Sequence, residues 1–516
     1  MGYSLGWIES LTACLLIFAL VMACSARLAR RWLYIILPTL AALLWLLAGR
    51  ALVVWGVVLM WKAPLRTFIF YMSSWTVAFA VGAVIVLRRG LGVRADVPPA
   101  KSWPRTKLAI ATGVAILAYA MTLWNVNLAA QNKLAAIRAE AGALALSILP
   151  SRPPDSENAA LLYEKASELI GKDTKTPRYS DDADAEKLQA FLREHEPALR
   201  LLRRAAVMPH CYFDRGYPIP TSWEELMRGL DDLRQGARLL ELDARVQAAQ
   251  GQAGPALEDV SAIFGMARHM GESPFLIHVL VTINIGSIGH STLEAVLADC
   301  EPSEADLAVL RPDEVFSYWR LFQRSIRMER AYGLSVFADQ HAAGVGAAFT
   351  LKELSGYRSL MAELDKVLAL PCHEALQGMK RLEAEALGGR RGLFAAGLYP
   401  ALETNAANAA MAEAMHRLDN LALAATAYRI KHGAFPTQPD DLVPEFLMAV
   451  PKDPFDGEPI RMKATEEGIL FHSIGPDTKD DGGAELKYNG DTGNWIGDPT
   501  FRLRMSAAKS PRNGAR

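Results

Sequence analysis

Residues 67–89 read TFIFYMSSWTVAFAVGAVIVLRR, an apolar run that ends in a pair of arginines. About 20 mostly apolar residues are enough to cross the hydrocarbon core of a bilayer. Three further runs qualify by the same measure, at residues 7–26, 33–61 and 108–128. Arg50 interrupts the second of these runs, and splitting it there would leave a piece too short to cross, so we expect one long tilted helix. The sequence therefore predicts a four-span transmembrane domain over residues 1–129.

Basic residues set the orientation of such spans, because loops rich in Lys and Arg stay in the cytoplasm. The first loop carries three arginines and the third carries six basic residues, whereas the second loop has two and the stretch before the first span has none. We therefore predict that the N-terminus and everything after residue 128 lie outside the cytoplasm. This topology describes a multi-pass protein of the cell inner membrane, with membrane lipid around its spans.

The charge of the chain is divided unevenly between its two parts. The 516 residues carry a formal net charge of −1, but residues 1–129 hold 12 basic and two acidic residues, and the other 387 hold 43 basic and 54 acidic ones. A net-acidic outer part lacks the basic surface that nucleic-acid binding needs, so we expect no nucleic acid among the partners. Since 51% of the residues are hydrophobic, we also expect a folded chain.

Residues 130–400 have the pattern of an irregular α-helical domain outside the cytoplasm. Along one stretch, apolar residues recur at steps of four and three and so share one helix face: Leu226, Leu230, Leu233, Ala237 and Leu240. Tetratricopeptide-like hairpins fit parts of the region, but no 34-residue period runs through it. The apolar residues 275–288 are too few for a fifth span and predict a buried core helix. Helices are predicted at residues 131–149, 184–206, 253–269, 274–296, 303–309, 312–340 and 351–368.

No catalytic motif stands out in this helical region. His269, His278 and His290 lack the spacing of metal ligands. The sequence contains no zinc-protease, serine-hydrolase or P-loop motif. These observations favour a role other than catalysis, with a membrane-anchored hydrolase as the alternative.

The outer part contains three cysteines, Cys211, Cys300 and Cys372. Cys372 precedes His373 and Glu374, a thiol beside a base, but neighbours on a helix point in different directions and so do not form a dyad. In an oxidising compartment one disulfide can form, and the pairing we favour is Cys211 with Cys300.

A different pattern begins near residue 401. We predict a helix over residues 401–431 that ends at Gly433, and strands over residues 460–464 and 468–473. Three motifs follow in order: Tyr428-x-x-x-x-Gly433-x-Phe435-Pro436-Thr437, Asp453-Pro454-Phe455-x-Gly457-x-Pro459 and Ser473-Ile474-Gly475-x-Asp477. With these motifs, residues 404–498 resemble the C-terminal domain of the major pseudopilin of type II secretion systems. The resemblance implies a small α+β domain at residues 401–500, and we expect residues 501–516 to form a disordered tail.

In that family the loop after the third motif binds a structural calcium ion, so the resemblance implies calcium as a cofactor. Asp477-x-Lys479-x-Asp481-Gly482 follows the spacing of a calcium loop, with Lys479 in place of the second ligand. The ligands expected are side-chain or carbonyl oxygens of four residues: Ile474, Asp477, Asp480 and Asp481. The alternative is a solvated acidic turn in which Lys479 is the counter-ion.

The chain departs from pseudopilins at its beginning. Gly6-Trp7-Ile8-Glu9 has no basic leader before it and places Glu third rather than fifth, and the pseudopilin-like module follows four predicted spans. We therefore do not expect the chain to be processed and polymerised as a pilus subunit. The rest of the chain resembles uncharacterised multi-span envelope proteins. The expected function is binding or assembly, with protein partners in a type II secretion or pilus-like machinery.

Overall fold

The computed structural model describes residues 105–171, 173–180, 184–214, 223–310, 312–340, 347–387, 393–489 and 494–504. Residues 112–516 belong to one compact unit, and the account below concerns that unit. The first three expected spans lie outside the described residues. The fourth falls within α4 (Arg105–Ile148), a single helix of 44 residues that continues past residue 128 without a break. The boundary expected at 129/130 is therefore inside a helix.

The described part of the chain is mostly helical, as predicted, with a small antiparallel sheet near the C-terminus. The helices of the middle region are α5 (Ala160–Ile170), α6 (Ala185–Ala206), α7 (Trp223–Met227), α8 (Leu230–Ala249), α9 (Ala253–Gly271), α10 (Leu276–Asp299), α11 (Glu304–Leu307), α12 (Tyr318–Gln340), α13 (Ala347–Leu368) and α14 (Cys372–Leu387). Short 3₁₀ helices lie at η1 (Asp155–Glu157) and η2 (Pro439–Leu442). The predicted bounds of α6, α9 and α10 agree with the observed ones to within three residues.

The helix α10 lies in the middle of this region. Among the described residues it is the one helix that is long and apolar enough to cross a membrane, and 56% of its most apolar window is buried in the protein. It contacts α8, α9, α12 and the final strand β5 (Thr500–Arg504). Since protein surrounds α10 on several sides, it is a core helix, as predicted for residues 275–288.

A second feature of the helical region is a buried ionic network. Beside this network, the predicted apolar face of α8 is buried in the core, with Leu230, Leu233, Ala237 and Leu240. The guanidinium of Arg203 on α6 donates to both carboxylate oxygens of Asp259 on α9, at 2.6 and 3.1 Å. It also donates to Asp243 on α8. Because Asp259 is fully buried, this network links three helices within the interior of the protein.

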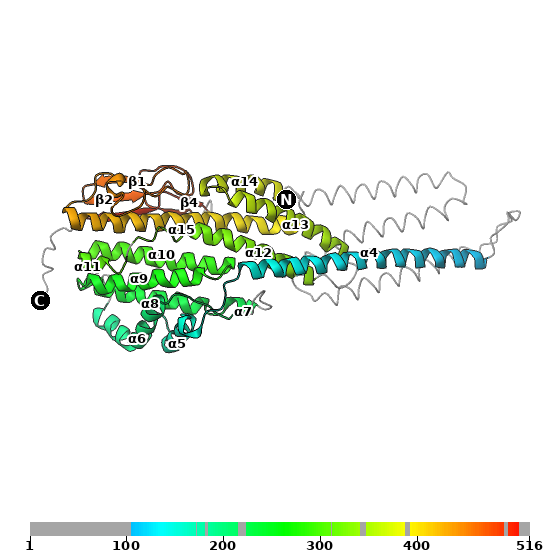
Figure 1. Ribbon diagram of the computed structural model, residues 1–516, viewed down its shortest axis with the longest axis horizontal. Coiled ribbons are helices and arrows are strands. Elements are labelled where there is room, and N and C mark those ends of the chain that lie inside the picture. The colour runs from blue at the N-terminus through cyan, green and yellow to red at the C-terminus, as the bar shows by residue number, and fades with distance from the viewer. Residues whose placement is uncertain are drawn as a thin grey trace. The chain divides into compact units, whose positions relative to one another are not determined.

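The long helix α15 (Leu393–His432) runs through two hydrophobic cores and lies between the sheet and α10 in Figure 1. In its first half, Ala406 and Ala410 pack with α12, α13 and α14. In its second half, Leu418 and Leu421 pack with α9, α10 and the sheet. Gly433 follows the helix with a φ of +77°, as predicted for its C′ position. The boundary expected at 400/401 falls inside α15, and residues on both sides of it share a core.

The sheet contains β1 (Arg461–Thr465), β2 (Gly468–His472) and β5 in the order β1-β2-β5, with antiparallel pairing throughout. β3 (Lys487–Asn489) and β4 (Asn494–Ile496) form a separate two-stranded ribbon. The predicted strands correspond to β1 and β2. The prediction of a disordered tail from residue 501 is wrong for residues 501–504, because β5 pairs with β2 and buries Phe501 and Leu503. Residues 505–516 lie outside the described residues.

Glu329 of α12 reaches the start of α10, where its Oε1 accepts a hydrogen bond from the backbone N–H of Leu276 at 3.2 Å. Burial raises the pKa of this carboxyl from 4.5 to about 6, although the hydrogen bond from Leu276 opposes the shift. A raised pKa means that the folded state binds the proton more tightly than the unfolded chain does. The group's contribution to stability is therefore present below pH 4.5 and is lost as the pH rises through about 6.

Glu329→Gln is expected to raise the free energy of unfolding by about 2 kcal/mol near pH 8 and to leave it almost unchanged near pH 4. Gln keeps an oxygen that can accept from Leu276 but carries no charge to desolvate. Thermal melts of both proteins at the two pH values measure the difference. Glu258→Gln, an exposed change on α9, is the control. A difference between wild type and Glu329→Gln that does not vary with pH would contradict the assignment.

Candidate functional site

The acidic turn that follows β2 is where the sequence predicts a calcium site. The Oδ1 of Asp477 accepts from the backbone N–H of Lys479 at 3.1 Å and so closes its own turn. The buried Ile474 donates its N–H to Asp453 at 2.8 Å. Asp481 donates its N–H to Asp498 at 3.4 Å. Of the four predicted ligands, only Asp480 joins a cluster of possible metal-binding side chains among the described residues.

That cluster contains His472, Asp480 and Asp498, whose ligand atoms all lie within 4.8 Å of one another. Burial raises the pKa of Asp498, and hydrogen bonds from Gly483 and Asp481 oppose the shift. The Nδ1 of His472 is buried and has no hydrogen-bond partner among the residues that the structure describes, while its Nε2 lies 3.2 Å from Asp480 Oδ1.

These residues do not fit a calcium ion. Calcium takes roughly six to eight oxygen ligands, whereas this cluster offers one imidazole nitrogen and two carboxylates. One of the carboxylates, Asp480, already accepts a hydrogen bond from the Arg461 Nε at 3.2 Å. The donor set and the guanidinium both argue against calcium at this position.

The guanidinium of Arg461 is the positive group of the turn, in place of the expected Lys479. Its three nitrogens each contact a different carboxylate, those of Asp453, Asp456 and Asp480. The backbone N–H of Gly482, and then His472 and Arg461, hold the pKa of Asp480 below its ordinary value. One guanidinium is therefore shared by three carboxylates of the turn.

Asp453 is the most buried member of this cluster, with 1% of its surface exposed. It accepts from Ser473 Oγ at 2.9 Å, from the Ile474 N–H at 2.8 Å and from the Phe455 N–H at 3.0 Å. One carboxylate thus joins the second and third sequence motifs. The two motifs therefore lie side by side in the fold.

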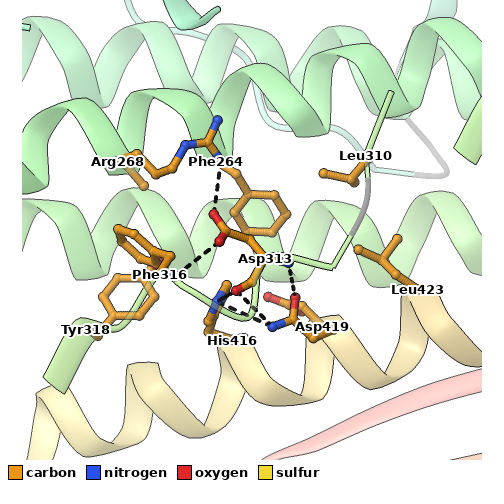
Figure 2. A pocket seen from close by; sticks show the side chains of 11 residues that line it. Phe264, Arg268, Leu310, Asp313, Phe316, Tyr318, His416, Asp419 and Leu423 are labelled. Atoms are coloured by element: carbon orange, nitrogen blue, oxygen red, sulfur yellow. Dashed lines mark hydrogen bonds and ion pairs between the residues drawn. The ribbon is translucent and has the colours of Figure 1, made fainter. Parts of the chain in front are cut away.

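A small pocket lies between α9, α15 and the loop before α12 (Figure 2). Its polar lining includes Arg268, Asp313, His416 and Asp419. His416 Nε2 donates to the backbone carbonyl of Asp313 at 2.8 Å, and Arg268 lies 3.8 Å from the Asp313 carboxylate. The pocket volume is about 30 Å³, which is room for about one water molecule. Its polar groups hold the loop at residues 312–317 against α15.

Next to this pocket, His290 and Asp419 form a buried pair. The Nδ1 of His290 lies 2.7 Å from Asp419 Oδ1. Burial lowers the pKa of His290, but the charge and hydrogen bond of Asp419 outweigh burial and raise it above its ordinary value. The ring also bonds the backbone of Thr500. The pair therefore connects α10, α15 and β5.

Two further buried histidines of the middle region bond to protein groups through both ring nitrogens. His269 contacts Tyr163 Oη at 2.8 Å and the Met208 carbonyl at 2.9 Å. His278 contacts Ser273 Oγ at 2.5 Å and the Leu226 carbonyl at 2.8 Å. These contacts hold neighbouring helices and loops together.

Cys211, Cys300 and Cys372 are all thiols in the structure, so the disulfide favoured between Cys211 and Cys300 is not present. Cys211 lies in the core of α5 and α6, while Cys300 lies in the core that contains the sheet. Burial raises the pKa of the Cys372 thiol far above its ordinary value. His373 lies 3.8 Å from Glu374, in a weak contact that activates no nucleophile.

The comparisons with known proteins add no relative. No protein-family model matches this chain, and no curated protein or solved structure is similar enough to count as a match. The site must therefore be interpreted from its own geometry.

Sequence reasoning missed five residues of the acidic turn: Asp453, Asp456, Arg461, His472 and Asp498. Asp453 belongs to a quoted motif, so its place in the sequence was a usable signal. For Arg461 and His472 the sequence predicted only that they belong to two strands. Asp498 follows β4 and approaches the turn through backbone bonds from Asp481 and Gly483, which no local pattern indicates.

Proposed function

We propose that this chain is an inner-membrane protein whose helical domain and C-terminal sheet lie outside the cytoplasm and bind protein partners of a type II secretion or pilus-like assembly. The observation that carries the proposal is the arrangement of residues 393–504. One long helix, α15, is followed by an antiparallel sheet that packs on its second half. This is the small α+β arrangement that the motif resemblance implies. The apolar runs and basic loops of residues 1–129 support the membrane part of the proposal.

The ribbon of β3 and β4 offers a contact surface for such a partner. Trp495 and Ile496, both on β4, are 40% and 46% exposed. Tryptophan is enriched among the residues that dominate binding at protein interfaces. Trp495 and Ile496 point to opposite faces of β4, so the face that carries Trp495 is the first place to look for a partner.

The second candidate function, a membrane-anchored hydrolase, is favoured by one observation. His416, Asp419 and Asp313 come together at the pocket beside α15. The pocket has room for about one water molecule, and His416 is bonded to the Asp313 backbone. Partner binding is therefore the better supported function.

Site-specific crosslinking in cells tests the proposal. With a photoreactive amino acid at position 495, we expect an adduct with a pilin-like subunit of the secretion machinery, identified by an antibody against that subunit. The control position is Leu169 on α5, which is 54% exposed and lies on a different element. Equal adducts at both positions, or none at 495, would count against the proposed partner. A reporter fused after residue 504 that is active only in the cytoplasm would overturn the topology.

A further inference from the structure

The acidic turn of the C-terminal sheet contains a guanidinium where the resemblance implies a metal ion. Arg461 stands at the start of β1, between the carboxylates of Asp453, Asp456 and Asp480. The Nη1 of Arg461 lies 3.1 Å from Asp453 Oδ2, and its Nε lies 3.2 Å from Asp480 Oδ2. The Nη2 donates a hydrogen bond to Asp456 Oδ2. All three nitrogens of the fork are used, each by a different carboxylate.

Three carboxylates that face one point repel one another unless a positive group lies between them. Divalent cations meet this need in many acidic loops, and arginine can meet it too because its planar fork offers five donors and stays charged. Exposure varies across the cluster: the Asp453 side chain is fully buried, the Arg461 side chain is 25% exposed and the Asp480 side chain is 49% exposed. The geometry of a central charge with carboxylate oxygens around it is therefore already complete.

The same contacts organise the turn that the sequence assigns to calcium. Asp453 anchors Ser473 and Ile474, where the turn leaves β2, and Asp480 accepts the Gly482 N–H, where the turn returns. Arg461 bonds both of these carboxylates and so holds the two ends of the turn together. A calcium ion bound between these segments would have the same effect.

We propose that the Arg461 guanidinium takes the place of a bound cation in this turn, so that the C-terminal sheet keeps its fold without calcium. We further infer that Arg461→Gln converts the turn into a binding site for a divalent cation with oxygen ligands. The ligands would be the carboxylates of Asp453, Asp456 and Asp480. This inference is independent of the proposed partners, because it concerns only contacts within the chain.

The test uses the full-length protein in detergent, with hydrogen exchange of peptides that cover residues 453–483 in calcium chloride or in chelator. Wild-type protein is expected to show the same protection in both. Arg461→Gln is expected to lose protection in chelator and to regain it with calcium, with half-saturation on the order of 0.1–1 mM, the range of extracellular calcium modules. Lys463→Gln is the matched control, because Lys463 lies on the same strand and contacts the Gly482 carbonyl but none of the three carboxylates. It is expected to behave as wild type.

Two results would overturn the proposal. Loss of protection in wild-type protein on adding chelator would show that a cation is already part of the turn. An Arg461→Gln protein that folds but does not respond to calcium would show that the carboxylates do not form a cation site. If Arg461→Gln fails to fold, the wild-type comparison still decides the first point. Arg461→Lys then tests whether a positive charge at this position holds the turn: it is expected to stay protected in chelator, and a loss of protection there would contradict the role given to Arg461.

Discussion

Phe501→Ala is expected to lower the free energy that holds the C-terminal sheet closed by about 3–5 kcal/mol. The ring is fully buried, pairs with Phe471 across β5 and β2, and meets the ring of His290 edge-on at 5.5 Å. Removing it leaves a cavity at the point where strand, sheet and helix α10 meet. Hydrogen exchange of the amides of β2 and of the second half of α15 measures the opening free energy of this core.

Arg502→Ala is the matched control for this prediction. Arg502 is the next residue of the same strand and is exposed, and the hydrogen bond from its backbone N–H to Glu294 does not depend on its side chain. A change within about 0.5 kcal/mol is expected. Equal effects of the two substitutions would mean that β5 contributes little to the core.

Asp259→Ala is expected to lower the free energy of unfolding by about 3 kcal/mol. Removing one partner of a buried ion pair costs about 3–5 kcal/mol, because the remaining charge loses its compensation. We expect the lower end of this range because Arg203 keeps its contact with Asp243 and because the Arg203 side chain is 27% exposed. The thermal midpoint of the full-length protein, compared with wild type in one detergent, measures the loss.

The control for Asp259→Ala is Asp231→Ala, which removes the exposed partner of Arg234. A surface pair of this kind contributes about 0–1 kcal/mol, so we expect almost no change in the midpoint. An Asp259→Ala protein that melts like wild type would show that water replaces the carboxylate and that the network does not stabilise the helices.

Elements with a local signal were predictable from the sequence. The α8 face from Leu230 to Leu240 follows the helical period, so its burial could be inferred from spacing alone. Gly433 could be placed because a helix end favours a residue that adopts positive φ. β1 and β2 are two short runs separated by a turn of two residues. In each case the residues that decide the structure are close together in the chain.

The acidic turn could not be predicted in the same way. Its spacing fits a calcium loop, but Arg461 is 19 residues from Asp480 and lies on β1, before the turn, so only the folded chain shows that a guanidinium lies among the carboxylates. His290 and Asp419 are 129 residues apart and equally without a local signal. β5 was predicted as disordered because it is short and next to a basic end. Its two buried residues are recognisable only beside β2.

The position of β5 at the end of the described chain determines when the protein can finish folding. The core that it completes begins at Ala244 on α8, so its first and last members are more than half of the residues from 105 to 504 apart. Contacts between such distant segments form slowly, and synthesis proceeds from the N-terminus. The apolar faces of α9, α10 and α15 are therefore made before the strand that covers part of them exists. A newly synthesised chain therefore passes through a stage in which this apolar surface is exposed. A chain truncated before residue 500 is expected to keep that surface exposed.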